Sequence, residues 1–134
     1  MFDTIEREDT PVICVARTGT PEDIPGAAHA AWHDLEAVIP PHGRKLFGFW
    51  DPSALEYRAC YATREDDNAD LERTVLPGGP YRRSRLKGED AYERIGPAFD
   101  ELAKDAAVDE GRPWLEVYRR HDEVDVLVPI KPEP

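Results

Sequence analysis

The stretch Arg112-Pro113-Trp114-Leu115-Glu116-Val117-Tyr118 decides how this chain is interpreted, because it joins strand-forming residues to a single carboxylate. Trp, Leu, Val and Tyr favour β-strands, and the proline stands where a strand begins. Side chains alternate between the two faces of a strand, so Trp114, Glu116 and Tyr118 share one face. The leucine and the valine share the other. The stretch therefore predicts a strand that presents a glutamate between two aromatic rings.

Two interpretations of this glutamate are open. A glutamate on a strand is most often solvated on an outer face. If the face is buried, a carboxylate between large rings costs free energy unless a partner meets it. Ring faces attract cations, so such an arrangement suits a pocket for a flat, cationic or polarised ligand. A second copy of the pattern favours the pocket.

That second copy lies earlier in the chain. Residues 43–50, with the sequence Gly-Arg-Lys-Leu-Phe-Gly-Phe-Trp, align position by position with residues 111–118. Gly and Arg are identical in the two stretches, and the apolar positions correspond. We therefore predict a duplicated unit inside a single domain that spans residues 1–134. The first repeat covers about residues 11–65 and the second about 70–130.

Each repeat is predicted to run strand, helix, strand, strand. Apolar residues at spacings of three and four from Ile24 to Ile39 and from Tyr92 to Ala106 predict two amphipathic helices. The predicted strands cover residues 12–18, 45–50, 55–64, 71–87 with a break at 77–80, 114–118 and 123–130. The predicted fold class is α+β: a tandem β-α-β-β duplication with a pseudo-two-fold axis. Its antiparallel sheet should carry two helices on one face and a ligand cleft on the other.

Strand alternation predicts which side chains face the helices and which face the cleft. The residues expected to face the helices are Phe47, Phe49, Leu115 and Val117. The residues expected in the cleft are Leu46, Gly48, Trp50, Trp114, Glu116 and Tyr118. The repeat pairs Gly48 with Glu116, and a glycine opposite a glutamate leaves room for a ligand.

The charge balance limits the classes of partner. The chain has 17 Lys and Arg against 28 Asp and Glu, a net charge of −11. Nucleic acids and anionic membrane surfaces both repel such a protein, so we predict no direct nucleic-acid binding and no membrane binding. No apolar run is long enough to span a bilayer, and the acidic start does not resemble a signal peptide. Cys14 and Cys60 are expected to be buried free thiols, as is usual in the reducing cytoplasm.

Other chemistry has little support in the sequence. His29 and His33 have a spacing that zinc ligands use on helices, but the rest of that motif is absent. Neither serine lies in a nucleophile elbow, and no phosphate-binding loop is present. We therefore predict no metal and no cofactor.

Several segments are assigned structural roles. Trp32 and Tyr92 are expected in the core of the protein. The basic cluster at residues 82–87 is expected on an exposed strand edge, where charge discourages pairing with a second chain. A homodimer through such an edge is also possible. The acidic run at residues 65–70 is expected to be a solvated loop.

The ordered motifs resemble those of the GyrI-like, or AraC-type effector-binding, domain family. They are Gly-Phe-Trp at 48–50, the stretch at 112–118 and Val-Pro-Ile at 128–130. The resemblance covers about residues 11–130. It implies a tandem β-α-β-β fold with a ligand cleft between the halves. It also implies that Glu116 meets cationic aromatic ligands, with Trp50 lining the cleft. The ten residues before Pro11 are too few for the DNA-binding domain that regulators of this family carry.

Three functions follow as hypotheses. The first is binding of small hydrophobic or aromatic, cationic compounds, with Glu116 as counter-ion and Trp50, Trp114 and Tyr118 stacking on the ligand. The second, implied by the resemblance, is hydrolysis of strained, cyclopropane-bearing genotoxins. Glu116 would then be the general base, and Tyr118 a proton donor. The third is antagonism of a gyrase-directed toxin through a protein–protein contact.

Overall fold

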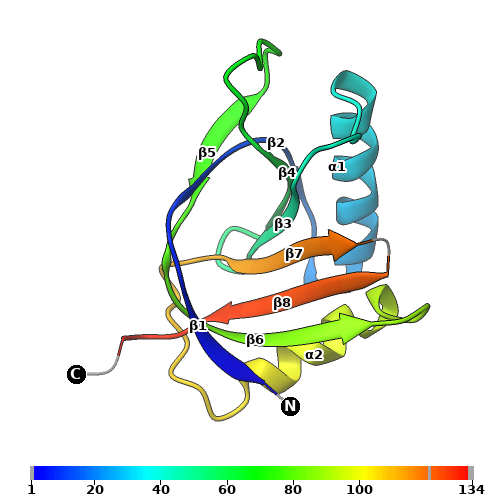
Figure 1. Ribbon diagram of the computed structural model, residues 1–134. Helices are drawn as coiled ribbons and strands as arrows, with labels where there is room; N and C mark the ends of the chain where they lie inside the picture. Colours follow the sequence, from blue (N-terminus) through cyan, green and yellow to red (C-terminus); the bar gives the residue numbers. More distant parts are fainter. Residues whose placement is uncertain (1, 121, 133–134) are drawn as a thin grey trace.

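One antiparallel sheet and two helices make up the protein (Figure 1). The structure is a computed structural model and describes residues 2–120 and 122–132. The strands are β1 (Asp3–Arg7), β2 (Thr10–Thr18), β3 (Leu46–Asp51), β4 (Glu56–Ala62), β5 (Glu72–Leu76), β6 (Gly79–Lys87), β7 (Trp114–Arg120) and β8 (Glu123–Pro129). The helices are α1 (Ile24–Val38) and α2 (Ile95–Ala103), which follow the short 3-10 turns η1 (Pro21–Asp23) and η2 (Tyr92–Arg94). The predicted α+β class with an antiparallel sheet is confirmed.

The sheet is joined at its centre by β3 and β7. Within the described residues the strand order is β1-β6-β8-β7-β3-β4-β2-β5. Along the central pair, Gly48 lies opposite Glu116, Trp50 opposite Trp114 and Leu46 opposite Tyr118. Residues 43–50 and 111–118, the two similar stretches of the sequence, therefore contain neighbouring strands of the sheet.

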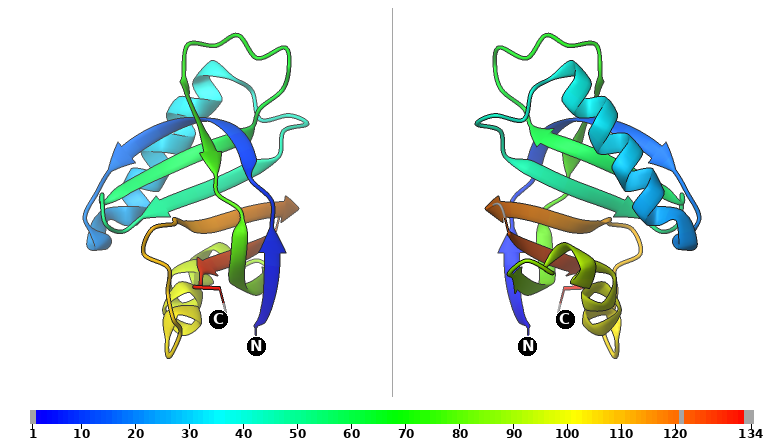
Figure 2. Two further views of the ribbon diagram at one scale, coloured as in Figure 1. Left: turned by 90° about the vertical axis from the view of Figure 1, so that its left-hand side faces the viewer. Right: turned by 90° about the vertical axis from the view of Figure 1, so that its right-hand side faces the viewer.

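Both helices cover the same side of the sheet (Figure 2). α1 packs on β2 and β4, and α2 packs on β8 and β6. α1 turns Ala27, Ala31 and Leu35 toward the strands, at the four-residue spacing that keeps side chains on one helix face. α2 does the same with Phe99 and Leu102.

A long two-stranded ribbon spans the opposite side of the sheet. β1 and β2 follow each other almost without interruption, and so do β5 and β6. Arg7 lies opposite Gly79 and Thr10 opposite Leu76, so the two ladders keep one register. At the crossing, the Gly78 amide donates to Asp9 Oδ1 at 2.6 Å. A Cβ at Gly78 would overlap the Arg7 carbonyl oxygen, so the close approach requires glycine.

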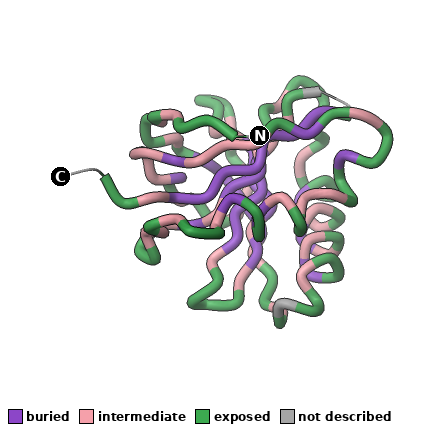
Figure 3. The backbone as a smooth tube through the Cα atoms, turned by 90° about the horizontal axis from the view of Figure 1, so that it is seen from below, coloured by how far each residue is buried: buried purple, intermediate pink, exposed green. Residues whose placement is uncertain are grey.

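The ribbon corrects one prediction about the faces. Phe47, Phe49, Leu115 and Val117 do not face the helices; they pack against residues of the ribbon and neighbouring strands. The side chains expected on the helix-free side instead lie on the helix side. Both faces of the sheet are therefore covered, and the buried residues are concentrated along the strands (Figure 3). When both faces are apolar, alternation separates the two sets of residues but does not say which set meets the helices.

Further corrections concern the ends of the ribbon. The acidic start of the chain forms β1, which was not predicted. A break between β5 and β6 is present, but it is shorter than the expected 77–80, because β5 ends at Leu76 and β6 begins at Gly79. The basic cluster lies on β6, which is not an edge, because β1 and β8 flank it. Arg85 donates to both carboxylate oxygens of Asp125, at 2.8 and 3.1 Å. Arg83 pairs with Asp3 of β1, so two arginines of β6 neutralise acids of the strands on either side.

The acidic run is only partly a solvated loop. Asp67 accepts two hydrogen bonds of 2.8 Å from Arg44, and both side chains are less than a tenth exposed. The Arg44 guanidinium holds the pKa of the Asp67 carboxyl at about 2. This pair fastens the connection between β4 and β5 to the start of β3.

The two cysteines are buried, as expected. Cys14 and Cys60 lie opposite each other on β2 and β4, and both thiols are free. None of the helices in the described part of the chain is long and apolar enough to cross a bilayer.

Candidate functional site

Glu116 lies at the centre of the helix-covered side, in a chain of hydrogen bonds. The hydroxyl of Tyr118 donates to Oε1 of Glu116 at 2.6 Å, and that of Tyr57 donates to the same oxygen at 2.7 Å. The indole Nε1 of Trp32 donates to the Tyr57 hydroxyl at 2.9 Å. Strand β7, strand β4 and helix α1 thus each supply one neighbour. No described residue donates to the second oxygen, Oε2.

Gly48 makes room for this arrangement. It lies opposite Glu116 across the β3–β7 ladder. A Cβ at this position would overlap both Oε1 of Glu116 and the hydroxyl oxygen of Tyr57. Glycine is therefore needed for the carboxylate and the phenol to meet above β3. Gly48 itself does not line the cavity.

Burial dominates the electrostatics of the group. Glu116 is 8% exposed, and no Lys or Arg of the described chain forms an ion pair with it. Burial raises the pKa of the Glu116 carboxyl, while the hydrogen bonds from Tyr118 and Tyr57 oppose the rise. Burial and the neighbouring carboxylate also raise the pKa of both phenols, so they stay protonated and act as donors. The carboxylate of Glu116 thus accepts hydrogen bonds from two phenols, and no described Lys or Arg pairs with it.

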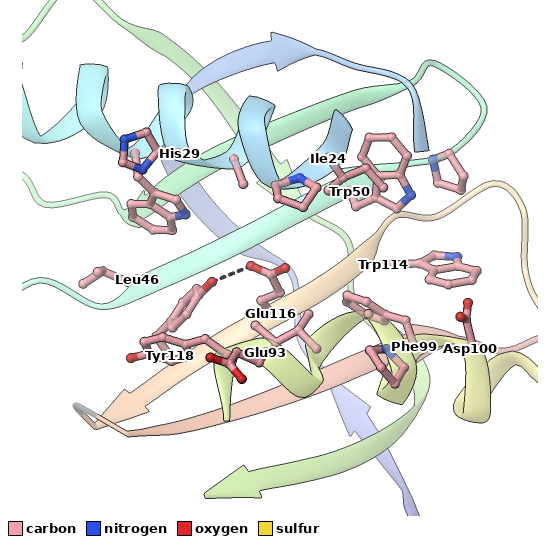
Figure 4. A pocket seen from close by; sticks show the side chains of 18 of the residues that line it. Ile24, His29, Leu46, Trp50, Glu93, Phe99, Asp100, Trp114, Glu116 and Tyr118 are labelled. Atoms are coloured by element: carbon pink, nitrogen blue, oxygen red, sulfur yellow. Dashed lines mark hydrogen bonds between the residues drawn. The ribbon is translucent and has the colours of Figure 1, made fainter. Parts of the chain in front are cut away.

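A cavity of about 1070 Å³ opens above Glu116, between the two helices (Figure 4). The central strands form its floor, α1 forms one wall, and η2 with α2 forms the other. Most of its lining is apolar or aromatic. The aromatic side chains of the lining are Trp32, Trp50, Tyr92, Phe99, Trp114 and Tyr118. The volume and the lining of this cavity are those of a site for an organic molecule.

The rings surround the carboxylate from several directions. Trp32 meets Tyr118 edge to face, with centroids 5.6 Å apart. Tyr92 meets Tyr118 in the same way at 5.7 Å. At the other end, Phe99 lies 5.5 Å from Trp114. Contacts of this kind between rings hold the aromatic side chains in place around the carboxylate.

The structure brings together most of the residues expected in the cleft. The residues from that set that line the cavity are Leu46, Trp50, Trp114, Glu116 and Tyr118. The predicted position of the cavity, on the side away from the helices, is wrong, however. It lies between the helices, because the ribbon fills the other side.

Other residues of the site were missed or misassigned. Trp32 is not simply a core residue, because it also lines the cavity. Tyr92 is 50% exposed at the cavity wall, so its assignment to the core was wrong. Tyr57 was left without a role. Its contact with Glu116 joins residues 59 positions apart, and such pairing is visible only once β4 is placed beside β3.

No cluster of His, Cys, Asp or Glu suited to a metal ion is present in residues 2–120 and 122–132. His29 does lie at the cavity wall, on an exposed position of α1. His33 does not line the cavity.

Comparison with known proteins relates the chain to other structures but not to a sequence family. No family model matches the sequence, and no curated protein matches it. An integron cassette protein from the mobile metagenome of Vibrio cholerae matches with a TM-score of 0.74 and 16% identity, over 97% of this chain and 95% of that one.

Two further structures bear on function. A protein solved with bound tetraphenylphosphonium matches with a TM-score of 0.66 and 12% identity, over 98% of this chain and 94% of that one. A protein from Listeria innocua described as a hydrolase matches with a TM-score of 0.53 and 10% identity, over 97% and 91%. At these identities the likeness shows a shared fold. One protein with this fold binds an aromatic cation.

Proposed function

We propose that the cavity binds flat or globular hydrophobic cations, with Glu116 as the counter-ion. The observation that carries this proposal is a buried carboxylate that has no cation beside it. Two phenols occupy Oε1, while Oε2 has no described donor and belongs to a residue of the cavity lining. A bound cation would supply the missing charge. The neighbour with bound tetraphenylphosphonium supports this ligand class for the fold.

The energetics are sufficient for useful affinity. A desolvated contact between a cation and an aromatic face contributes about 2 kcal/mol. Micromolar binding requires about 8 kcal/mol. The ring faces, the carboxylate and apolar burial together can reach that value.

The proposal includes membership of the GyrI-like family and an origin by duplication. Sheet order supports the duplication, because the strands on the two sides of the β3–β7 seam follow the same sequence outward. β3, β4 and β2 succeed one another on one side, and β7, β8 and β6 on the other. The opposition of Gly48 and Glu116 in the central ladder supports a site near the proposed pseudo-two-fold axis.

The test is a tryptophan-fluorescence titration with ethidium, a planar cation, and with phenanthridine, its uncharged parent ring. We expect saturable quenching by ethidium that Glu116→Gln weakens about tenfold or more, equivalent to at least about 1.4 kcal/mol. Phenanthridine binding should change less than about twofold, because its contacts are apolar. Glu65→Gln, on the exposed loop, is the matched control and should leave both ligands unaffected.

Two results would contradict the proposal. Equal weakening of the cation and the neutral ring would remove the counter-ion role. The absence of saturable binding by either would remove the cavity as a site and favour the protein–protein hypothesis.

Hydrolysis of strained electrophiles is the second candidate function. The contact between the Tyr118 hydroxyl and Glu116 Oε1 places a proton donor beside a carboxylate, and one structural neighbour is described as a hydrolase. Oε2 would activate the attacking water as general base. Incubation with a cyclopropane-bearing electrophile should give ring-opened product that Glu116→Gln abolishes. Binding without turnover would exclude this candidate and leave the first.

A further inference from the structure

The charged side chains around the cavity are nearly all acidic. The titratable carboxyl and imidazole groups of its lining are His29, Glu36, Glu93, Asp100 and Glu116. No Lys or Arg is among the described lining residues. Several arginines elsewhere in the described chain pair with other acids, as Arg85 does with Asp125.

The outer carboxylates are not neutralised by the protein. Glu36 extends from α1, Glu93 from η2 and Asp100 from α2. None of the three forms an ion pair with a residue in the described ranges, and all three are exposed. An exposed acidic cluster alone is usually a solvated surface. Glu116 distinguishes this one, because it is nine-tenths buried beneath the same cavity and its Oε2 has no described donor.

The register of β3 and β7 sets the spacing of these charges. Glu116 lies at the middle of the floor, two residues from Trp114 on one side and two from Tyr118 on the other. Two residues of strand correspond to about 7 Å. Asp100 follows Phe99, which packs on Trp114, and Glu93 follows Tyr92, which packs on Tyr118. Figure 4 shows the two carboxylates toward opposite ends of the cavity, with Glu116 between them.

We infer that the preferred ligands are elongated aromatic dications. The inner charge pairs with Glu116, and the second charge reaches an outer carboxylate at one end of the floor. This inference rests on the proposed cation binding and narrows its ligand class. A monocation pairs only with the carboxylate of Glu116, whereas the second charge of a dication also pairs with an outer carboxylate. Because the outer groups are exposed, their contribution is modest and sensitive to salt.

Ethidium and propidium provide a matched pair of probes. They share the phenanthridinium ring, and propidium adds a quaternary ammonium on a short alkyl arm. For wild type we expect propidium to bind about three- to tenfold more tightly than ethidium at low salt. One of two variants should abolish this preference: Asp100→Asn at the Trp114 end, or Glu36→Gln/Glu93→Gln at the Tyr118 end. Glu36 belongs to that second end because it lies one helical turn from Trp32, which packs on Tyr118. Ethidium affinity should change less than about twofold in either variant. The variant that abolishes it identifies the end that holds the second charge.

A second double variant controls for the net charge of the protein. Glu65→Gln/Asp66→Asn removes the same two negative charges from an exposed loop and should leave the preference for propidium intact. Equal affinity for both dyes in wild type would overturn the inference. A preference for propidium that survives both Asp100→Asn and Glu36→Gln/Glu93→Gln would also overturn it. The same holds if the loop control removes the preference as fully as these variants do. Each of these outcomes leaves cation binding itself standing. Loss of all saturable binding would instead remove the proposed function.

Discussion

At the scale of single residues, the proposed counter-ion role of Glu116 would couple cation binding to protonation. Its pKa is raised by burial, so the carboxyl takes up a proton at a higher pH than an exposed glutamate. The two phenols donate to Oε1, and no described residue donates to Oε2. In the proposed complex, a proton and a cationic ligand would therefore compete for Oε2.

This competition predicts that cation affinity falls as the pH is lowered. Binding should be strongest where Glu116 is ionised and should weaken as the pH falls through its raised pKa, by up to about tenfold per pH unit. The measurement is the dissociation constant of ethidium between about pH 8 and about pH 5. Glu116→Gln should give a flatter profile.

Other titratable groups near Glu116 require a control. Tyr57 and Tyr118 stay protonated throughout this range because their pKa values are raised. His29 also lines the cavity. A His29→Gln variant that removes the pH dependence, with Glu116 intact, would refute the assignment to Glu116.

The sequence predicted part of this site for a local reason. Alternation along Leu-Glu-Val-Tyr places Glu116 and Tyr118 on one face without knowledge of the fold. Tyr57 and Trp32 could not be found in this way. They come from a neighbouring strand and a helix, and only the packed sheet brings them together.

At the scale of elements, the β3–β7 pair depends on a residue without a side chain. Gly48→Ala should destabilise the protein by about 2 kcal/mol, because its Cβ would displace Glu116 or Tyr57. It should also weaken ethidium binding. Urea unfolding and the dye titration measure the two effects.

Gly96→Ala is the matched control for this substitution. Gly96 lines the cavity, and a Cβ there meets nothing within 4 Å, so the change should be neutral or slightly stabilising in the helix. A loss of stability for Gly96→Ala comparable to that for Gly48→Ala would show that the close contact is not the cause.

Arg112 fastens the break in the ribbon. Its guanidinium donates to the carbonyl oxygens of Gly78, Pro80 and Ile130, at 3.1, 2.9 and 2.6 Å, and to Asp109. Arg112→Lys should destabilise the protein by about 2–3 kcal/mol, since an ammonium lacks the planar fork. The exposed pair of Arg17 with Asp34 offers the comparison, and Arg17→Lys should cost under about 0.5 kcal/mol in the same urea experiment. Equal effects would contradict this role of Arg112.

The elements show where sequence reasoning ends. Helix periodicity located α1 and α2, and the two stretches that the predicted repeat aligned form β3 and β7, which pair in the sheet. The helix-bearing face was assigned wrongly because the ribbon buries the other face as well. All seven residues of β8 are buried because both of its faces are covered: Val124, Val126 and Val128 pack on the helix side, and Leu127 packs on the other side.

At the scale of the whole molecule, the net charge of −11 should attract any cationic ligand toward the cavity. Raising the ionic strength from about 0.02 M to about 0.5 M shortens the screening length from about 20 Å to about 4 Å. Ethidium affinity should fall several-fold over this range, while phenanthridine affinity should not fall. Isothermal titration at several salt concentrations tests this, and a parallel decline of both ligands would exclude an electrostatic origin.

The continuous ribbon has a consequence for how the protein is assembled. β1 begins the chain yet pairs with β6, and β5 precedes β6 yet pairs with β2. Each side of the β3–β7 seam thus takes its outermost strand from chain that crosses over from the other side. Under the proposed duplication, neither repeat cut out by itself would retain all its strand neighbours. An ancestor of one repeat would then have exchanged these segments between two copies, and the present chain would be the covalent form of an interlocked pair.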